Sequence, residues 1–173
     1  GGSKDNTIEI AKAYTDKIFS SNNSNLTKDR QIGITNCQNE LVAMIDSDHI
    51  LMPGDLSSLV DDLFYYNLDI VQSGLEAYEL KGFWVKAENE AWKLTHNRPL
   101  GVRQMIGTAP AIYKKYIFEH IQFSDEITKT IDDTDFMFRL SKLDNFRIGI
   151  GKTKIKQLHF SSFKSYFKKF FWY

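Results

Sequence analysis

Apolar residues recur at a spacing of three or four positions in several stretches of the chain, which predicts amphipathic helices. The first stretch places Ile8, Ala11 and Tyr14 on one helical face. A cap for this helix is available from Asp5 or Asn6 just before it. Further helices are predicted at residues 26–36, 56–66, 82–94, 114–120, 133–143 and 161–173.

Short apolar or alternating runs between these helices predict β-strands. The strands fall at residues 40–46, 69–80, 107–113, 146–151 and 154–160, and we expect the run at 107–113 to form an edge of the sheet. Strands that alternate with helices are typical of an α/β fold, in which helices pack in layers on a sheet. The pattern therefore predicts an α/β layer sandwich.

The chain opens with a turn-rich segment, residues 1–7, that leads straight into a helix. In α/β folds such a turn normally follows a strand. We therefore expect a first strand and its following helix to lie ahead of this chain, so that the fold is truncated at its N-terminus.

The composition is that of one globular domain. The chain has 173 residues, of which 42% are hydrophobic and 25% charged, and this is enough apolar material for a single core. Its formal net charge is zero, which argues against recruitment of nucleic acid by a global field. The last 22 residues carry six Lys and no acid, which leaves 16 basic and 22 acidic residues in the rest. We predict a domain at residues 1–160 and a basic amphipathic helix at 161–173.

Cysteine usage and hydropathy favour a cytoplasmic location. A single cysteine, Cys37, excludes an internal disulfide and a multi-cysteine zinc site, and it fits a reducing compartment. No apolar run approaches the roughly 20 residues of a membrane span. The lysines and aromatic face of residues 161–173 suit two roles, either peripheral contact with an anionic membrane surface on its cytoplasmic face or docking to a partner.

Two carboxylates, Asp46 and Asp48, follow an apolar run at the point where a strand is predicted to end. Ligands of open α/β sheets bind at the carboxyl ends of strands. Carboxylates one residue apart suit a hard divalent cation with its phosphate ligands, although acidic turns of this kind are also common without a function. Two histidines are candidates for a further ligand, His49 beside the pair and His159 at the end of the last strand.

Three more carboxylates, Asp132, Asp133 and Asp135, gather at the start of the helix predicted at 133–143. The simplest explanation is that they stabilise the helix N-terminus. The alternative is that Asp133 is a general base that takes a proton from an acceptor hydroxyl, and that the adjacent pair divides structural and catalytic duties. Arg30 either contacts a diphosphate or a base carbonyl or forms a surface ion pair.

Taken in order, these segments resemble the inverting nucleotide-sugar glycosyltransferases of family 2, which have the GT-A fold. The opening GGSKDNT is similar to the family's D-G-S-x-D-x-T turn, and KDRQIG is similar to its A-R-N-x-G helix. IDSDH resembles its D-x-D loop, and IDDTDF resembles its E-D-x-D helix. The resemblance spans nearly the whole chain and implies a mixed sheet flanked by helices in a three-layer sandwich.

The resemblance also implies roles for individual residues. Asp48 would bind a divalent cation, Mn²⁺ or Mg²⁺, that bridges the donor diphosphate, and Asp46 would face the ribose or the metal. Asp133 matches the catalytic base of the family, with Asp132 in place of the usual Glu. The remaining matches imply donor binding by Arg30, Ser3 and Asp5 and metal binding by His159.

The implied activity is the metal-dependent transfer of a sugar, with inversion, from a nucleotide-diphosphate donor to a hydroxyl acceptor on a glycan or a lipid-linked molecule. The strand expected ahead of the chain would carry part of the nucleotide pocket, so we expect this fragment alone to bind its donor weakly or to be inactive. Two alternatives remain. One is a nucleotidyltransferase, which generally has a Gly-rich triphosphate loop that is not visible here, and the other is a non-catalytic carbohydrate-binding domain.

Overall fold

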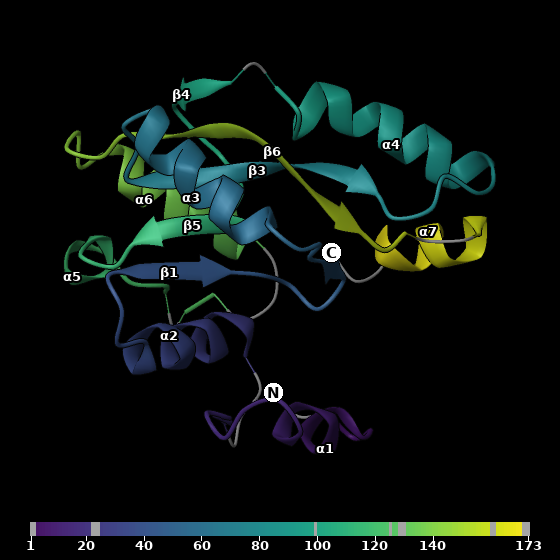
Figure 1. The fold of residues 1–173 in the computed structure, drawn as a ribbon, viewed down its shortest axis with the longest axis horizontal. Coiled ribbons are helices and arrows are strands. Elements are labelled where there is room, and N and C mark those ends of the chain that lie inside the picture. Colours follow the sequence, from purple (N-terminus) through teal and green to yellow (C-terminus); the bar gives the residue numbers. More distant parts are fainter. Residues whose placement is uncertain are drawn as a thin grey trace.

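A mixed β-sheet with helices packed against it organises the chain (Figure 1). The computed structural model describes residues 3–21, 25–98, 100–124, 126–127, 131–159 and 162–170. The strands are β1 (Leu41–Met44), β2 (His49–Ile50), β3 (Ile70–Ala77), β4 (Gly101–Arg103), β5 (Ala111–Lys114) and β6 (Ile148–Gln157). The helices are α1 (Thr7–Lys12), α2 (Leu26–Asn36), α3 (Asp55–Tyr65), α4 (Phe83–Thr95), α5 (Ile117–His120), α6 (Asp132–Ser141) and α7 (Phe163–Phe170).

The sheet is built around β3 and β6, which pair in parallel. The strand order is β1-β5-β3-β6-β2, and β4 also pairs with β6. All pairs except β3 with β6 are antiparallel. The loop 45–48 leaves the carboxyl end of β1, which is the kind of position at which α/β sheets bind ligands.

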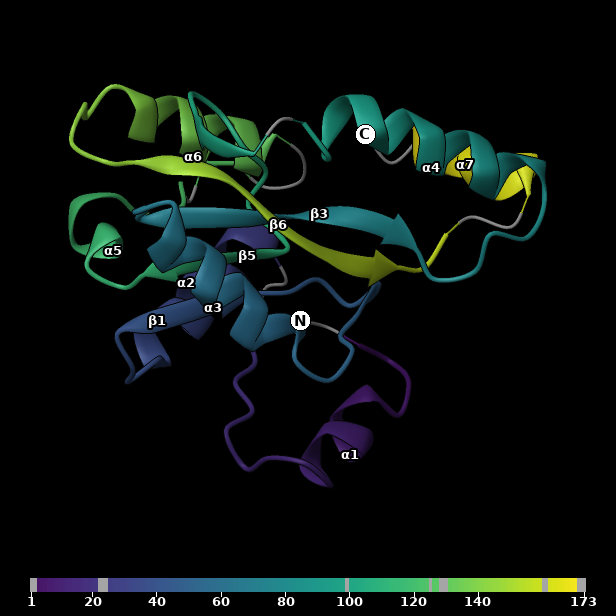
Figure 2. The same cartoon turned by 45° about the horizontal axis from the view of Figure 1, so that its top comes forward.

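Two apolar clusters divide the core between the two faces of the sheet. Successive strand residues point to opposite faces, so Ile70 joins the cluster formed with α2, α5 and α6, whereas Val71 joins the cluster formed with α3. Leu63 of α3 and Phe136 of α6 are fully buried in these clusters. Figure 2 shows α3 and α6 on opposite sides of the sheet, which confirms the predicted three-layer arrangement.

One strand prediction was wrong in its position. The run at 107–113 is predicted at a sheet edge, but β5 lies between β1 and β3. Ala111 and Tyr113 are fully buried, because strands on both sides and helices on both faces cover them. The short strands β2 and β4 were not predicted, because two or three residues are too few to show a period.

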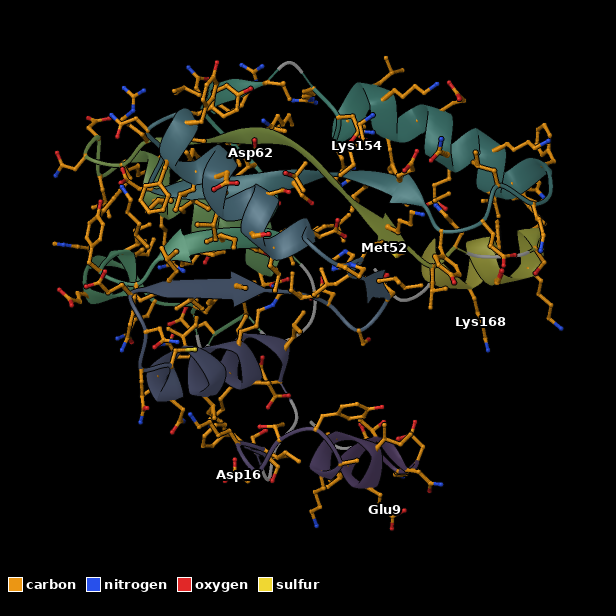
Figure 3. The ribbon with its side chains drawn as sticks, in the orientation of Figure 1. Glu9, Asp16, Met52, Asp62, Lys154 and Lys168 are labelled. Carbon is orange, nitrogen blue, oxygen red and sulfur yellow. The ribbon has the colours of Figure 1, made fainter. Side chains whose placement is uncertain are left out.

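A second correction concerns the two strands predicted at 146–151 and 154–160, which form the single strand β6. The interruption between them is a bulge, since β3 pairs Gln72 with Ile150 but Gly74 with Lys154. Asp62 of α3 supports this bulge, because its Oδ2 accepts hydrogen bonds from the backbone N–H (2.8 Å) and the hydroxyl (2.6 Å) of Thr153 (Figure 3).

The helix predicted from the stripe at the N-terminus is shorter than its apolar pattern. α1 ends at Lys12, and Ile8 and Tyr14 of the stripe are 43% and 85% exposed. Its N-cap position is Asn6, whose side chain makes no capping hydrogen bond, whereas the Asp5 carboxylate accepts from the Thr7 N–H at 3.1 Å. The apolar spacing alone did not bury the stripe, because burial requires a second element to cover it.

The C-terminal helix packs beside α4 (Figures 1 and 2). The rings of Trp84 and Phe163 lie 5.1 Å apart, and this contact joins the two helices. Residue 161 and residues 171–173 of the predicted helix lie outside the described residues. Across the described ranges, none of the helices combines the length and the apolar character needed to cross a membrane.

Candidate active site

A cavity of about 1260 Å³ lies at the carboxyl end of β1. Its walls come from distant segments of the chain, namely α2, β1 with the loop 45–48, residues 107–109, the start of α6, and α7. Five carboxylates line it, those of Asp29, Asp46, Asp48, Asp132 and Asp133. The basic side chains among its described lining residues are Arg30 and Lys168, together with the imidazole of His96.

Arg30 connects the walls of this cavity. Its Nη2 donates to Asp46 Oδ1 at 3.1 Å, and its Nη1 donates to Asp132 Oδ2 and, at 3.2 Å, to Thr108 Oγ1. The guanidinium also lies 5.7 Å from the ring centroid of Phe123. Arg30, with only 14% of its side chain exposed, therefore links the loop 45–48 to α6. Its contact with a donor remains a prediction.

The first two carboxylates of α6 have different environments. Asp132 is paired with Arg30 and only 9% of its side chain is exposed, whereas Asp133 is exposed and lines the cavity. Burial raises the pKa of Asp132 above its ordinary 3.8; Arg30 opposes this rise and Asp133 adds to it. Asp133 Oδ1 accepts from the Thr134 N–H at 2.7 Å, and among the described residues its Oδ2 accepts no hydrogen bond. Of the two carboxylates, Asp133 is therefore the one exposed at the cavity, with an oxygen that accepts no hydrogen bond from the described residues.

The residue before α6 is strained. Ile131 has a φ of 67°, a left-handed conformation that costs a β-branched residue about 1–2 kcal/mol. Its carbonyl accepts the Asp135 N–H at 2.8 Å and so begins the helix. This strained residue comes just before Asp132, which points inward to Arg30, and Asp133, which lines the cavity.

The loop 45–48 holds its two carboxylates next to an imidazole. Ligand atoms of Asp46, Asp48 and His49 lie within 4.8 Å of one another, the one such group found among the described residues. The last strand supports the loop, since Gln157 Nε2 donates to Asp48 Oδ2 at 2.5 Å and the Leu158 N–H donates to the Asp48 carbonyl at 2.8 Å. Asp48 is thus positioned by a strand more than 100 residues later in the chain.

The two carboxylates of this group fit a divalent cation better than the imidazole does. His49 Nδ1 accepts a hydrogen bond from the Asp46 N–H at 2.9 Å, so in this tautomer Nε2 carries the proton and offers no lone pair. Burial lowers the pKa of His49, against the opposing effects of Asp48 and then Asp46, so the ring is neutral at pH 7. Carboxylate oxygens are the ligands that Mg²⁺ and Mn²⁺ prefer. Asp46 and Asp48 are therefore the residues that would hold the ion.

The other predicted ligand, His159, does not belong to the group within 4.8 Å. Its Nδ1 lies 3.0 Å from Glu88 Oε2, and its ring packs on Trp92 with centroids 4.2 Å apart. Its Nε2 is buried and has no hydrogen-bond partner among the described residues. A carboxylate on Nδ1 is the arrangement that leaves Nε2 with a lone pair for a metal. His159 is not among the described residues that line the cavity, and its metal role remains a prediction.

The two N-terminal residues assigned to donor binding are not brought to the cavity. Ser3 and Asp5 are exposed and precede α1, and neither is among the described residues that line the cavity. Asp5 instead accepts hydrogen bonds from Thr7, chiefly from its side chain, and these lower the pKa of Asp5. Their donor contacts remain predictions.

Sequence patterns missed several residues of the site. Thr108 binds Arg30, Gln157 binds Asp48, and Ser165 and Lys168 line the cavity from α7. None of them was singled out as a site residue, and each reaches the site through a contact between segments distant in sequence. The basic, amphipathic pattern of α7 is the only available signal, and it points equally to a membrane or a partner.

Removing the Arg30 side chain is expected to destabilise the protein. Arg30→Ala leaves the Asp132 carboxylate buried without its cation, which costs about 3 kcal/mol in the free energy of unfolding. The pKa of folded Asp132 is already raised and rises further without Arg30, so the folded state binds more protons than the unfolded state. The free energy of unfolding of the variant therefore falls as the pH rises. The loss relative to wild type is larger at about pH 8 than at about pH 5. Urea unfolding at both pH values measures this.

A matched control is available on the same helix. Arg139 pairs with Asp135 of α6 at 2.7 Å on a more exposed surface, so Arg139→Ala is expected to cost below about 0.5 kcal/mol with little dependence on pH. Equal losses in the two variants would contradict the role assigned to Arg30.

Comparisons with known proteins agree with the fold. The profile of glycosyl transferase family 2 matches residues 1–147. No curated protein matches the chain. Among solved structures, residues 1–349 of TarS from S. aureus in complex with UDP-GlcNAc are similar, with a TM-score of 0.68 and 16% identity over 95% of this chain and 49% of that one. The same protein in complex with UDP gives a TM-score of 0.67 and 16% identity over 96% and 51%. The chain spans about half the length of these structures, and the likeness confirms the GT-A-like fold.

Proposed function

Because the chain belongs to glycosyl transferase family 2, we propose that it transfers a sugar from a nucleotide-diphosphate donor to a hydroxyl acceptor with inversion at the anomeric carbon. The observation that carries this proposal is that Asp48 and Asp133, which come from separate elements 85 positions apart in the sequence, line the same cavity. One carboxylate suits the leaving-group side of the reaction and the other suits the acceptor side.

Asp133 is the proposed general base. Its Oδ2 takes the proton of the acceptor hydroxyl as the acceptor oxygen forms a bond to the anomeric carbon. The bond between that carbon and the diphosphate breaks at the same time, and the diphosphate leaves with both electrons. Attack opposite to the leaving group inverts the configuration, and no covalent sugar–enzyme intermediate is required.

Asp46 and Asp48 are the proposed holders of a divalent cation, Mn²⁺ or Mg²⁺, with His159 as a further ligand. A bound cation would offset the negative charge that develops on the leaving diphosphate. The protein's own contribution is to hold the two carboxylates in place, through Arg30 on Asp46 and through Gln157 on Asp48.

The proposed donor is a uridine-diphosphate sugar. The similar TarS structures contain UDP-GlcNAc and UDP, and this chain has the same fold. The proposed acceptor is a glycan or a lipid-linked molecule, and the basic helix α7 would suit a chain that works at the cytoplasmic face of a membrane.

The test is turnover of nucleotide sugars. In a longer protein that contains this chain, Mn²⁺ and a panel of UDP-sugars are expected to give release of UDP, which a coupled assay or chromatography measures, and this activity should be lost on chelation. Release of pyrophosphate from nucleoside triphosphates would instead indicate a nucleotidyltransferase. Binding of sugars or UDP-sugars with no turnover, in this chain and in a longer protein that contains it, would indicate a non-catalytic domain.

A further inference from the structure

The C-terminal helix forms part of the cavity wall. Phe163 of α7 packs on Trp84 of α4, and Phe167 lies next to Phe163 with ring centroids 5.5 Å apart. The contact with Trp84 places the Phe163 side of α7 against α4. Ser165 and Lys168, which are three residues apart and so share a helical face, line the cavity together with Asp48 and the loop 45–48. Figure 3 shows the Lys168 side chain leaving α7 on the side away from α4.

Among the described residues that line the cavity, Lys168 is a cation for which no ion-pair partner is described. Arg30 is bound to Asp46 and Asp132, and these contacts occupy its guanidinium. Among the described residues, no ion pair involves Lys168, and its helix contains no acidic residue in the described first turn. Ser165 is already engaged, because its hydroxyl donates to the Ser162 carbonyl at 2.7 Å. The Lys168 ammonium is therefore the group with three donors available to a ligand.

We propose that Lys168 binds the diphosphate of the nucleotide-sugar donor, so that α7 is a wall of the donor site. This inference rests on the proposed function, because it assigns a ligand group to the same cavity. A diphosphate is a dense anion, and an ammonium group is a usual phosphate ligand in proteins. In a cavity lined by five carboxylates, the anion needs cationic contacts besides a metal ion, and α7 supplies one.

Lys168 would also act on the leaving group. As the bond to the anomeric carbon breaks, negative charge grows on the diphosphate, and a lysine in contact with it stabilises that charge. The aromatic contact between Phe163 and Trp84 would hold the lysine over the cavity. The amphipathic pattern of α7 then has a purpose within the fold, with aromatic residues toward α4 and Lys168 toward the ligand.

The experiment compares ligands with and without the diphosphate. The affinities of UDP and of uridine are measured by ligand-observed NMR in the presence of Mg²⁺, for the wild type and for Lys168→Ala, Lys168→Arg and Lys164→Ala. Lys164 lies on the same helix, is exposed and does not line the cavity, so Lys164→Ala removes the same charge elsewhere. We expect Lys168→Ala to weaken UDP binding about tenfold and uridine binding by less than about twofold. Lys168→Arg should restore much of the loss, and Lys164→Ala should change UDP affinity by less than about twofold.

Other outcomes overturn the inference. If UDP binds the wild type and Lys168→Ala equally, Lys168 is not a diphosphate ligand, while the proposed function stands. If neither this chain nor a longer protein that contains it binds UDP or uridine, the proposed function fails and this assignment falls with it. If Lys168→Ala and Lys164→Ala both keep UDP affinity but lose flotation with phosphatidylglycerol vesicles, α7 is a membrane-contact helix and the assignment is wrong.

Discussion

Asp133→Asn is expected to lower the rate of sugar transfer by about 10²- to 10⁴-fold while the affinity for UDP stays within about twofold of the wild type. The amide has the size of the carboxylate but cannot accept the acceptor's proton. Asp133 is the carboxylate of α6 that is exposed at the cavity, and its Oδ2 is free of described hydrogen bonds. Initial rates of UDP release and calorimetric UDP titrations measure the two quantities separately.

Two neighbouring substitutions make this test specific. Asp135→Asn alters the same helical turn, but Asp135 pairs with Arg139 at 2.7 Å and does not line the cavity, so the rate should change by less than about threefold. Asp132→Asn removes the buried partner of Arg30 and is expected to show its main effect on the free energy of unfolding. If Asp133→Asn keeps half or more of the wild-type rate, Asp133 is not the base.

Asp48→Ala is expected to abolish the contribution of the divalent cation to the rate of UDP-sugar turnover. Removing one of the two carboxylates proposed to hold the ion should weaken Mn²⁺ binding about 10²-fold and lower UDP-sugar turnover to the level of the chelated wild type. Titration of Mn²⁺ by electron paramagnetic resonance measures the binding directly and does not depend on turnover. The variant should also become insensitive to added chelator.

An exposed acidic residue of α3 provides the control for this variant. Asp61 is exposed and lies outside the cavity lining, so Asp61→Ala removes the same charge with no expected effect on Mn²⁺ affinity. A wild-type Mn²⁺ affinity in Asp48→Ala would show that the D-x-D carboxylates do not hold the ion. That result would leave the base assignment of Asp133 unaffected, because its test does not measure metal binding.

Local patterns predicted most of the secondary structure. The helix at 26–36 has the predicted bounds, and α3, α4 and α6 begin and end within two residues of their predicted positions. These elements have an apolar face that recurs at a regular spacing, so the sequence contains their signal. The pattern failed where the signal depends on partners, since the bulge that joins two predicted strands into β6 requires pairing with β3 and support from Asp62.

The sequence pattern accounts for part of the candidate site, and the tertiary structure accounts for the rest. Asp46 and Asp48 are one residue apart after an apolar strand, and this local spacing is enough to place them at a ligand-binding edge of the sheet. Because the adjacent residues Asp132 and Asp133 have the same chemistry and the same local context, local spacing left a general base at Asp133 as an alternative to stabilisation of the helix N-terminus. The resemblance supported the base. The contact with Arg30 buries one of them and leaves the other at the cavity.

The amino-acid sequence by itself determined the α/β alternation, the positions of the acidic motifs and the amphipathic character of the last helix, because each is a property of residues close together along the chain. Only the tertiary structure decided which carboxylates share a cavity, that Arg30 links two of its walls, and that Lys168 of α7 lines it. These features arise from contacts between segments that lie up to 100 or more residues apart in the sequence. The energies of such contacts depend on burial and on distances in space, which the local spacing of residues does not report.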